Sequence, residues 1–258
     1  MTPKFTAIID GKNAGTEWGA YPAEGTLAAL LSLPEAGELI ANDWHERNGE
    51  EVSPAPVLTA FRDVTLPFVV QESKATALLD HFKSSPLHTI TIPELSASAV
   101  WKIALRDTGR AEYFPDTRLI DPVFAVISDP AETAATNPTA DGTELFAKLH
   151  SLGFQDLTGT REEMEKGAEV KEYLTGQKAP LTLQSYDITI PLYYGGTDIM
   201  QARTALTRYL LQPGERTLTY EGRTLKAVYL KSDTAEALKR PDGRWWWDLS
   251  ITLQVTTF

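Results

Sequence analysis

Residues 55–68 read APVLTAFRDVTLPF, and residues 179–192 read APLTLQSYDITIPL. The two segments align without a gap at a constant offset of 124 positions, which takes Pro56 to Pro180 and Asp63 to Asp187. They share the pattern A-P, six residues, then D-[VI]-T-[LI]-P-[FL]. An internal repeat determines how the rest of a chain is divided. This one predicts two related units within the 258 residues.

The segments that follow each copy also correspond in kind. A helical stretch comes first, then a proline and two β-type segments, and each half closes with another strand. In the first half we expect these elements at residues 76–82, 89–92, 100–105 and 123–127. In the second half we expect them at residues 199–211, 217–220, 224–230 and 245–255. The predicted unit is therefore strand, helix, hairpin and strand, present twice.

The repeated strand has one apolar face and one polar face, which is typical of a half-buried antiparallel strand. The apolar positions are Val64, Leu66, Phe68 and Val70 in the first copy and Ile188, Ile190, Leu192 and Tyr194 in the second. Pro67 and Pro191 recur inside it, and proline cannot donate a ladder hydrogen bond. We therefore expect that side of the strand at an edge or a bulge, where another subunit could add its sheet. Pro67 and Pro191 are candidate interface residues.

The last strand alternates more regularly than any other segment. Trp245 and Trp247 fall on the same face as the aliphatic residues that follow, whereas Trp246 falls on the opposite, exposed face. An exposed tryptophan marks a protein interface more often than a sugar site, and we predict an interface at Trp246. The helix before this strand is expected to start with Thr197 or Asp198 as its N-cap and to cover one face of the sheet.

Residues 128–143 read SDPAETAATNPTADGT and show no apolar periodicity, so they are interpreted as a linker or a long surface loop. The predicted organisation is a first domain at 1–128, a linker at 129–143 and a second domain at 144–258. The predicted fold class is α+β and β-rich, with two tandem related antiparallel units, each a β-sandwich or split barrel with a packed helix.

The charge and the apolar pattern exclude several classes of protein. The net charge is −11, with 35 acidic and 24 basic residues spread over both halves, so sequence-specific DNA binding is disfavoured. No stretch approaches the roughly 20 apolar residues of a membrane span, and the first residues lack the apolar block of a signal peptide. There is no cysteine. We expect a soluble, non-secreted protein of a reducing compartment, with no membrane partner.

No motif for catalysis or cofactor binding is present. The chain has no G-x-S-x-G elbow, no Walker loop and no G-x-G-x-x-G fingerprint. Gly195-Gly196 is interpreted as a turn and not as a phosphate-binding loop. Carboxylates are plentiful, but abundance does not identify a catalytic pair. None of the histidines has a metal-ligand spacing along the chain: His45, His81, His88 and His150. We expect no catalytic residues, no cofactor and no metal, and we do not expect an enzyme.

Several segments resemble bacteriophage tail proteins of the tail-tube and distal-tail (baseplate hub) superfamily, particularly those of phages that infect Bacteroides-type gut bacteria. They cover most of the first half and, through the repeat, the second half more weakly. The segments are Glu17–Tyr21 (EWGAY), Leu27–Leu31 (LAALL), Asn42–Gly49 (NDWHERNG), Arg62–Phe68 (RDVTLPF) and Trp247–Leu249 (WDL).

The resemblance implies a small antiparallel β-sandwich or split barrel with one helix, a unit that closes into rings by joining sheets. A chain with two such units would form a trimeric or hexameric ring that connects the tail tube to the tip. Its partners would be copies of itself, the tail tube and tail-tip proteins, with DNA passing through non-specifically. The implied location is the virion tail, and the host cytoplasm during assembly.

Residues 35–51 lengthen the connection before the repeated strand, and Trp44 stands there among acidic residues. We interpret this segment as an inter-subunit arm, with Trp44 as a fourth candidate interface residue. Two other functions stay open at this point. One is a carbohydrate-binding module or glycan-acting enzyme that uses Trp246 and nearby carboxylates, and the other is an adaptor in a bacterial secretion or injection machine.

Overall fold

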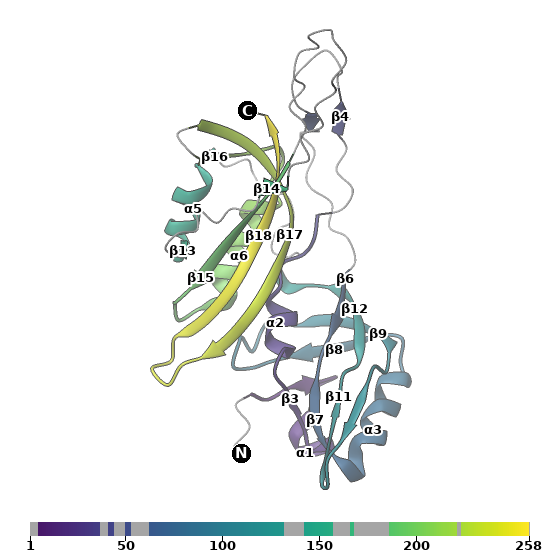
Figure 1. The fold of residues 1–258 in the computed structure, drawn as a ribbon. Helices are drawn as coiled ribbons and strands as arrows, with labels where there is room; N and C mark the ends of the chain where they lie inside the picture. Colours follow the sequence, from purple (N-terminus) through teal and green to yellow (C-terminus); the bar gives the residue numbers. More distant parts are fainter. Residues whose placement is uncertain are drawn as a thin grey trace.

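A computed structural model of the protein describes residues 5–36, 41–43, 50–52, 62–131, 142–156, 166–167, 186–220 and 223–257. Every strand pairing within these residues is antiparallel, and the longest helices have 12 residues. The predicted β-rich α+β class is confirmed (Figure 1). None of the helices described is both long and apolar enough to cross a membrane.

The described residues between 5 and 131 form two larger sheets, a small hairpin and several helices. The helices are α1 (Ala14–Trp18), α2 (Thr26–Leu31) and α3 (Glu72–Lys83). The strands are β1 (Ile8–Ile9), β2 (Lys12–Asn13), β3 (Ala20–Pro22), β6 (Arg62–Thr65), β7 (Phe68–Gln71), β8 (His88–Thr91), β9 (Trp101–Asp107), β10 (Ala111–Tyr113), β11 (Thr117–Ile120) and β12 (Val123–Ser128). One sheet has the order β2-β1-β8-β9-β12-β6 and the other β10-β11-β7-β3. A separate hairpin pairs β4 (Ala41–Asp43) with β5 (Glu50–Val52).

The described residues between 142 and 257 form one sheet with two helices. The helices are α5 (Leu145–Ser151) and α6 (Ile199–Leu210). The strands are β13 (Phe154–Asp156), β14 (Lys166–Gly167), β15 (Tyr186–Tyr194), β16 (Arg216–Tyr220), β17 (Arg223–Lys239) and β18 (Trp245–Thr257). The sheet has the order β13-β15-β18-β17-β16, and β14 also pairs with β15. The long strands β15, β17 and β18 run side by side in the upper half of Figure 1.

Four strands have the same spatial order in both halves. Along the chain they are β6, β8, β9 and β12 in the first half and β15, β16, β17 and β18 in the second. Within the sheets they lie in the orders β8-β9-β12-β6 and β16-β17-β18-β15. In both sheets, therefore, the second strand along the chain is followed by the third, the fourth and the first. A 12-residue helix separates the first and second strands in both cases, α3 in one and α6 in the other. The first half adds β7 before α3 and the β10–β11 hairpin before β12.

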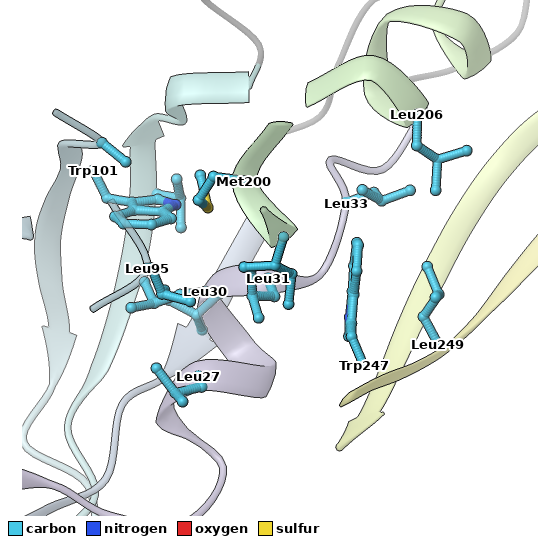
Figure 2. Close-up of a cluster of buried hydrophobic side chains, with 14 of the residues drawn as sticks. Leu27, Leu30, Leu31, Leu33, Leu95, Trp101, Met200, Leu206, Trp247 and Leu249 are labelled. Carbon is cyan, nitrogen blue, oxygen red and sulfur yellow. The ribbon is translucent and has the colours of Figure 1, made fainter. Parts of the chain in front are cut away.

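The core is continuous between the halves. Figure 2 shows Leu30 and Leu31 of α2 and Leu33, just after it, lying between Trp101 of β9 and Trp247 of β18. All five side chains are at most 1% exposed. The short helix α2 therefore fills the space between the two sheets, and its apolar residues belong to both cores.

The helix expected at residues 199–211 is confirmed as α6, and its predicted apolar stripe is buried. Asp198, and not Thr197, is the N-cap, because its Oδ1 accepts a hydrogen bond from the backbone N–H of Gln201 at 2.9 Å. This satisfies one of the donors that the first turn leaves unpaired. Arg203 lies on the same buried face, which the sequence pattern did not predict.

Two elements begin or end at least four residues beyond the predicted range. Helix α3 begins at Glu72, four residues before the expected start, and β17 continues to Lys239 instead of ending at Leu230. The register of β17 against β18 shifts at three places, including one between Tyr229 and Lys231. Because such irregularities interrupt the two-residue period, the alternation that identifies a strand is lost at that point.

Parts of the predicted organisation lie outside the described residues. These parts include residues 55–61 and 179–185 of the repeat, and residues 132–141 of the expected linker. The beginning of that linker is described, and it is not a surface loop: Asp129 is 1% exposed and Ala131 is 0% exposed. The reason is a buried charge cluster, described below.

Candidate interaction surfaces and buried polar clusters

The four predicted interface residues lie on different elements. Trp44 is outside the described residues. Pro67 lies between β6 and β7, Pro191 is inside β15, and Trp246 is the second residue of β18. The sequence analysis did not predict that these residues form one site. Their roles as interface residues stay predictions.

Pro67 marks the point where one strand leaves its sheet. Strand β6 pairs with β12, whereas β7, directly after Pro67, pairs with β11 and β3 in the other sheet. The Pro67 carbonyl accepts a hydrogen bond from the backbone N–H of Ala23 at 2.9 Å. Pro67 is half-buried. It therefore acts as a corner that is partly covered by this chain's own segment before α2.

Pro191 stays within an unbroken strand. Strand β15 pairs with β18 along its whole length, with Pro191 opposite Ser250. On its other side β15 pairs with β14 at residues 187–188 and with β13 at residues 192–194. Among the described residues no strand pairs with the interval 189–191 on that side. This fits the expectation that the proline lies where a ladder hydrogen bond is not needed.

Trp246 is on the outer face of β18, as its alternation predicted, with Trp245 and Trp247 buried behind it. It is half-buried and not fully exposed. Its indole stacks on Tyr193 with ring centroids 5.1 Å apart, and the Arg240 guanidinium carbon lies 4.6 Å from its centroid. Because both neighbours already contact the ring, less of its face is available for a sugar.

In each half, additional strands extend the shared four-strand arrangement at one edge, and this edge is not the same in the two halves. In the first half, β1 and β2 extend the sheet beyond β8, and β6 is the last strand. In the second half, β13 and β14 lie beyond β15, the counterpart of β6, and β16, the counterpart of β8, is the last strand. In the part of the chain that the structure describes, the outer sides of β6 and β16 therefore have no strand partner.

An aromatic hairpin tip was missed by the sequence reasoning. Tyr113, the last residue of β10, and Phe114, which follows it, are 66% and 48% exposed. The Arg118 guanidinium lies 4.4 Å from the centre of the Tyr113 ring. The signal in the sequence was two adjacent aromatic residues before a Pro-Asp turn. Exposed aromatic side chains are common in protein interfaces.

A buried cluster of three charges joins the halves. Asp129, directly after β12, accepts hydrogen bonds from Arg203 of α6 at 2.7 and 2.6 Å and from Arg62 of β6 at 2.9 Å. The side chains of Asp129 and Arg203 are 0% exposed. Burial alone would raise the pKa of the Asp129 carboxyl, but the two guanidinium groups, Arg203 above all, lower this pKa to about 2. The carboxylate is therefore ionised at neutral pH.

The same guanidinium groups bind the end of α2. Arg203 donates to the carbonyls of Leu31 and Ser32 at 2.9 and 2.8 Å, and Arg62 donates to the carbonyl of Ala29 at 3.0 Å. The last carbonyls of a helix lack intrahelical partners and carry its partial negative charge. The cations thus satisfy the C-terminal end of α2 while they pair with Asp129.

The segment after α2 is held by β17. Leu33 N–H donates to the hydroxyl of Ser232 at 2.8 Å, and Ala36 N–H donates to the carbonyl of Leu230 at 2.7 Å. The Tyr229 hydroxyl donates to the carbonyl of Pro34 at 2.9 Å, and burial raises the pKa of this hydroxyl. Together with the charge cluster, these bonds fix the two halves to each other through α2 and the residues after it.

A second polar cluster lies in the first half. Asp10 Oδ2 is 2.6 Å from His88 Nδ1 and 2.9 Å from His81 Nε2. Asp10 Oδ1 accepts a hydrogen bond from the Thr89 N–H at 2.7 Å. Burial alone would raise the pKa of Asp10, but hydrogen bonds from His88, Thr89 and His81 lower it. Linear spacing did not predict this cluster, because Asp10 is far from the histidines along the chain.

The comparisons with known proteins identify no family. No family model matches the chain, and no curated protein matches it. Among solved structures, the chain is similar to the SPP1 Dit (gp 19.1) protein, described as a paradigm of the hub adsorption apparatus in phages that infect Gram-positive bacteria. The TM-score is 0.31 at 13% sequence identity, over 98% of this chain and 99% of that chain. At these values no role is carried over from that protein.

Proposed function

We propose that this protein is a non-enzymatic structural component of a phage tail tip, a distal-tail or hub protein. Two related units in each chain would take part in a ring that joins the tail tube to the tip. Its partners would be further copies of itself and the adjoining tail proteins, and its location the virion tail. A host of the Bacteroides type, which the sequence resemblance implies, stays a prediction.

One observation carries this proposal: four antiparallel strands follow the same order in both sheets, with a 12-residue helix at the same point. Two unrelated halves have no reason to share both strand order and helix placement. Together with the repeated segments at residues 55–68 and 179–192, it supports an internal duplication of one unit. Tandem units of this kind are what the resemblance to tail proteins implies.

The connection between the halves also supports a role in assembly. A ring built from two-unit chains needs a fixed angle between the units, because small errors accumulate around the ring. The Arg62–Asp129–Arg203 cluster and the bonds between residues 33–36 and β17 provide such a fixed connection.

The edges that lack a strand partner among the described residues, β6 and β16, support a head-to-tail contact between chains. Strand β16 has the same position in the second-half sheet as β8 has in the first-half sheet. Strand β6 is likewise the counterpart of β15. Pairing β16 of one chain with β6 of the next would therefore continue the sheets from unit to unit. Such a contact uses two different surfaces, and it closes into a ring when the rotation per chain allows.

The test is negative-stain microscopy and mass measurement of the purified protein, alone and mixed with a tail tube protein from the same genome. We expect annuli with a central hole in at least one of the two samples. Absence of any oligomer in both samples would contradict the proposal. Binding on a glycan array that Trp246→Ala abolishes would replace it with the carbohydrate-binding alternative.

A pair of variants at one position tests the β16 edge. The N–H of Thr219 donates to the Glu144 carboxylate at 3.1 Å, so this group points away from the ladder with β17. Thr219→Pro removes the outward donor, together with its bond to Glu144, and leaves the ladder with β17 intact, since proline is tolerated where the N–H faces outward. Thr219→Val keeps the N–H and is the matched control. We expect Thr219→Pro to abolish the annuli and Thr219→Val to retain them.

A further inference from the structure

Three elements of the first half bring their side chains to one point. Asp10 is in the two-residue turn between β1 and β2, His81 is in the last turn of α3, and His88 is the first residue of β8. One ligand atom from each lies within 4.8 Å of the other two. It is the one such group of three in the part of the chain that the structure describes.

The hydrogen-bond partners of His88 leave it with an excess of acceptors. Its Nδ1 faces Asp10 Oδ2 at 2.6 Å, and its Nε2 faces the carbonyl oxygen of Phe82 at 3.0 Å. Neither partner can donate a proton when Asp10 is ionised. The His88 side chain is 0% exposed, so both ring nitrogens face only these acceptors. A cation between Nδ1 and Oδ2 would give both of these atoms an electron-pair acceptor as a partner.

We propose that Asp10, His81 and His88 form a binding site for one divalent transition-metal ion, with Zn²⁺ as the ion that fits best. The ligand atoms are Asp10 Oδ2, His81 Nε2 and His88 Nδ1. Two imidazoles and a carboxylate suit this class of ion, whereas Ca²⁺ and Mg²⁺ are bound by oxygen ligands alone. The site does not depend on the tail-tip proposal.

The surrounding contacts match those of a metal centre. A histidine that binds a metal donates its other ring N–H to a carbonyl or a carboxylate, which fixes its tautomer. His88 does so toward the Phe82 carbonyl. The second oxygen of the Asp10 carboxylate is held by the Thr89 N–H at 2.7 Å and by the Thr89 hydroxyl at 3.2 Å. These bonds orient Oδ2 toward the two histidines.

The geometry can adjust to a bound ion. Metal–ligand distances of about 2.0–2.1 Å in a tetrahedron separate the ligand atoms by about 3.3 Å. The Asp10 oxygen is now 2.6 and 2.9 Å from the two nitrogens, so the ligands would move apart by a few tenths of an ångström. The side chains of Asp10 and His81 are 30% and 20% exposed and have room for this shift. Their exposure also leaves a fourth position accessible to water.

Bound metal would tie the β1–β2 turn to the end of α3 and the start of β8. The turn itself is prepared for this role. Asp10 and Gly11 have φ angles of +50° and +77°, the two positive values of a type I′ hairpin turn. The turn places Asp10 beside β8, where β1 pairs with residues 90–91.

The test is a titration of ZnCl₂ into the full-length, EDTA-treated protein, followed by calorimetry and by thermal unfolding. We expect one bound ion per chain. At a free Zn²⁺ concentration one hundred times the Kd, the melting temperature should rise by roughly 5 °C or more. Absence of binding would overturn the proposal.

Two variants and a control assign the ligands. Asp10→Asn keeps an oxygen for the Thr89 N–H, and Asn-Gly is favourable in this turn, so the variant should fold. His81→Gln replaces a partly exposed helical residue. Each should weaken Zn²⁺ binding at least tenfold. The control is the double variant His45→Gln/His150→Gln, which removes the other two histidines of the chain and should bind as the wild type does. Equal affinity in all variants would overturn the site.

Discussion

The same sequence pattern has two structural outcomes in this protein. In the first half, the strand breaks at Pro67, and its two parts, β6 and β7, pair in different sheets. In the second half, Pro191 occupies the corresponding place in β15, which continues for nine residues beside β18. The apolar face is buried in both cases, so the alternation is preserved while the backbone path differs.

The difference lies in what the neighbouring segments offer. After Pro67 the backbone is bound on both sides, by β11 and by β3, and the Pro67 carbonyl accepts from Ala23. Around Pro191 the long strand β18 offers an unbroken partner. A proline therefore permits a corner but does not impose one, and the available partner strands decide the outcome.

The largest effect is expected where the two halves are joined. Asp129→Ala removes the carboxylate that Arg62 and Arg203 share and leaves the fully buried Arg203 guanidinium without this counter-charge. Breaking a buried ion pair from one side costs about 3–5 kcal/mol of unfolding free energy. Urea denaturation, followed by far-UV circular dichroism and tryptophan fluorescence, measures this loss of unfolding free energy. Separate transitions for the two signals would indicate that the halves of the variant unfold independently.

A double variant separates the net contribution of the cluster to the free energy of unfolding from the cost of removing only one of its charges. Asp129→Leu/Arg203→Met replaces one charge pair with apolar side chains, and we expect it to be less destabilised than Asp129→Ala. If the single variant were within 1 kcal/mol of the wild type, the cluster would not be what holds the halves together.

A glycine pair compares the turns of the two halves. Gly109, after β9, has a φ of +66°, and a Cβ there would lie 1.8 Å from the Asp121 carbonyl oxygen. Gly243, before β18, has a φ of +85° with no atom within 4 Å of the added Cβ. Gly109→Ala should cost about 2–4 kcal/mol from backbone strain and overlap. Gly243→Ala should cost only about 1 kcal/mol from strain. Thermal unfolding measures both, and equal losses would contradict this account.

Periodicity was sufficient to predict the longer strands of the repeated unit and both 12-residue helices, because burial follows the alternation of apolar residues. It did not predict the short strands β1 to β5, β10, β11, β13 and β14. It failed where irregular geometry intervenes. The shifted register near Tyr229 hides the second part of β17, and the break at Pro67 separates β6 from β7 without interrupting the apolar face. Sequence spacing also could not show that the four strands have one spatial order in both sheets.

The polar clusters could not be predicted for a different reason. Asp129 follows a strand and begins a segment of linker composition, yet it is buried because Arg62 and Arg203 arrive from elements far away in the sequence. Asp10 and His88 are likewise distant along the chain and adjacent in space. Trp246 was placed correctly, because the face of a strand residue depends only on local alternation. Groups that meet through tertiary packing leave no such local signal.

The smallest expected effect distinguishes the two prolines directly. Replacing proline costs about 0.4–1 kcal/mol because the unfolded chain gains freedom. In Pro191→Thr this loss is offset by the higher strand propensity of threonine within the unbroken β15, so the net change should be within about 0.5 kcal/mol. Pro67 lies outside both strands, so the strand propensity of threonine brings no such offset in Pro67→Thr. The full loss of unfolding free energy, up to about 1 kcal/mol, should remain. Paired urea titrations resolve the difference if the slopes are equal. If Pro191→Thr proved the more damaging change, the proline in β15 would be stabilising its strand edge in a way that the corner at Pro67 does not require.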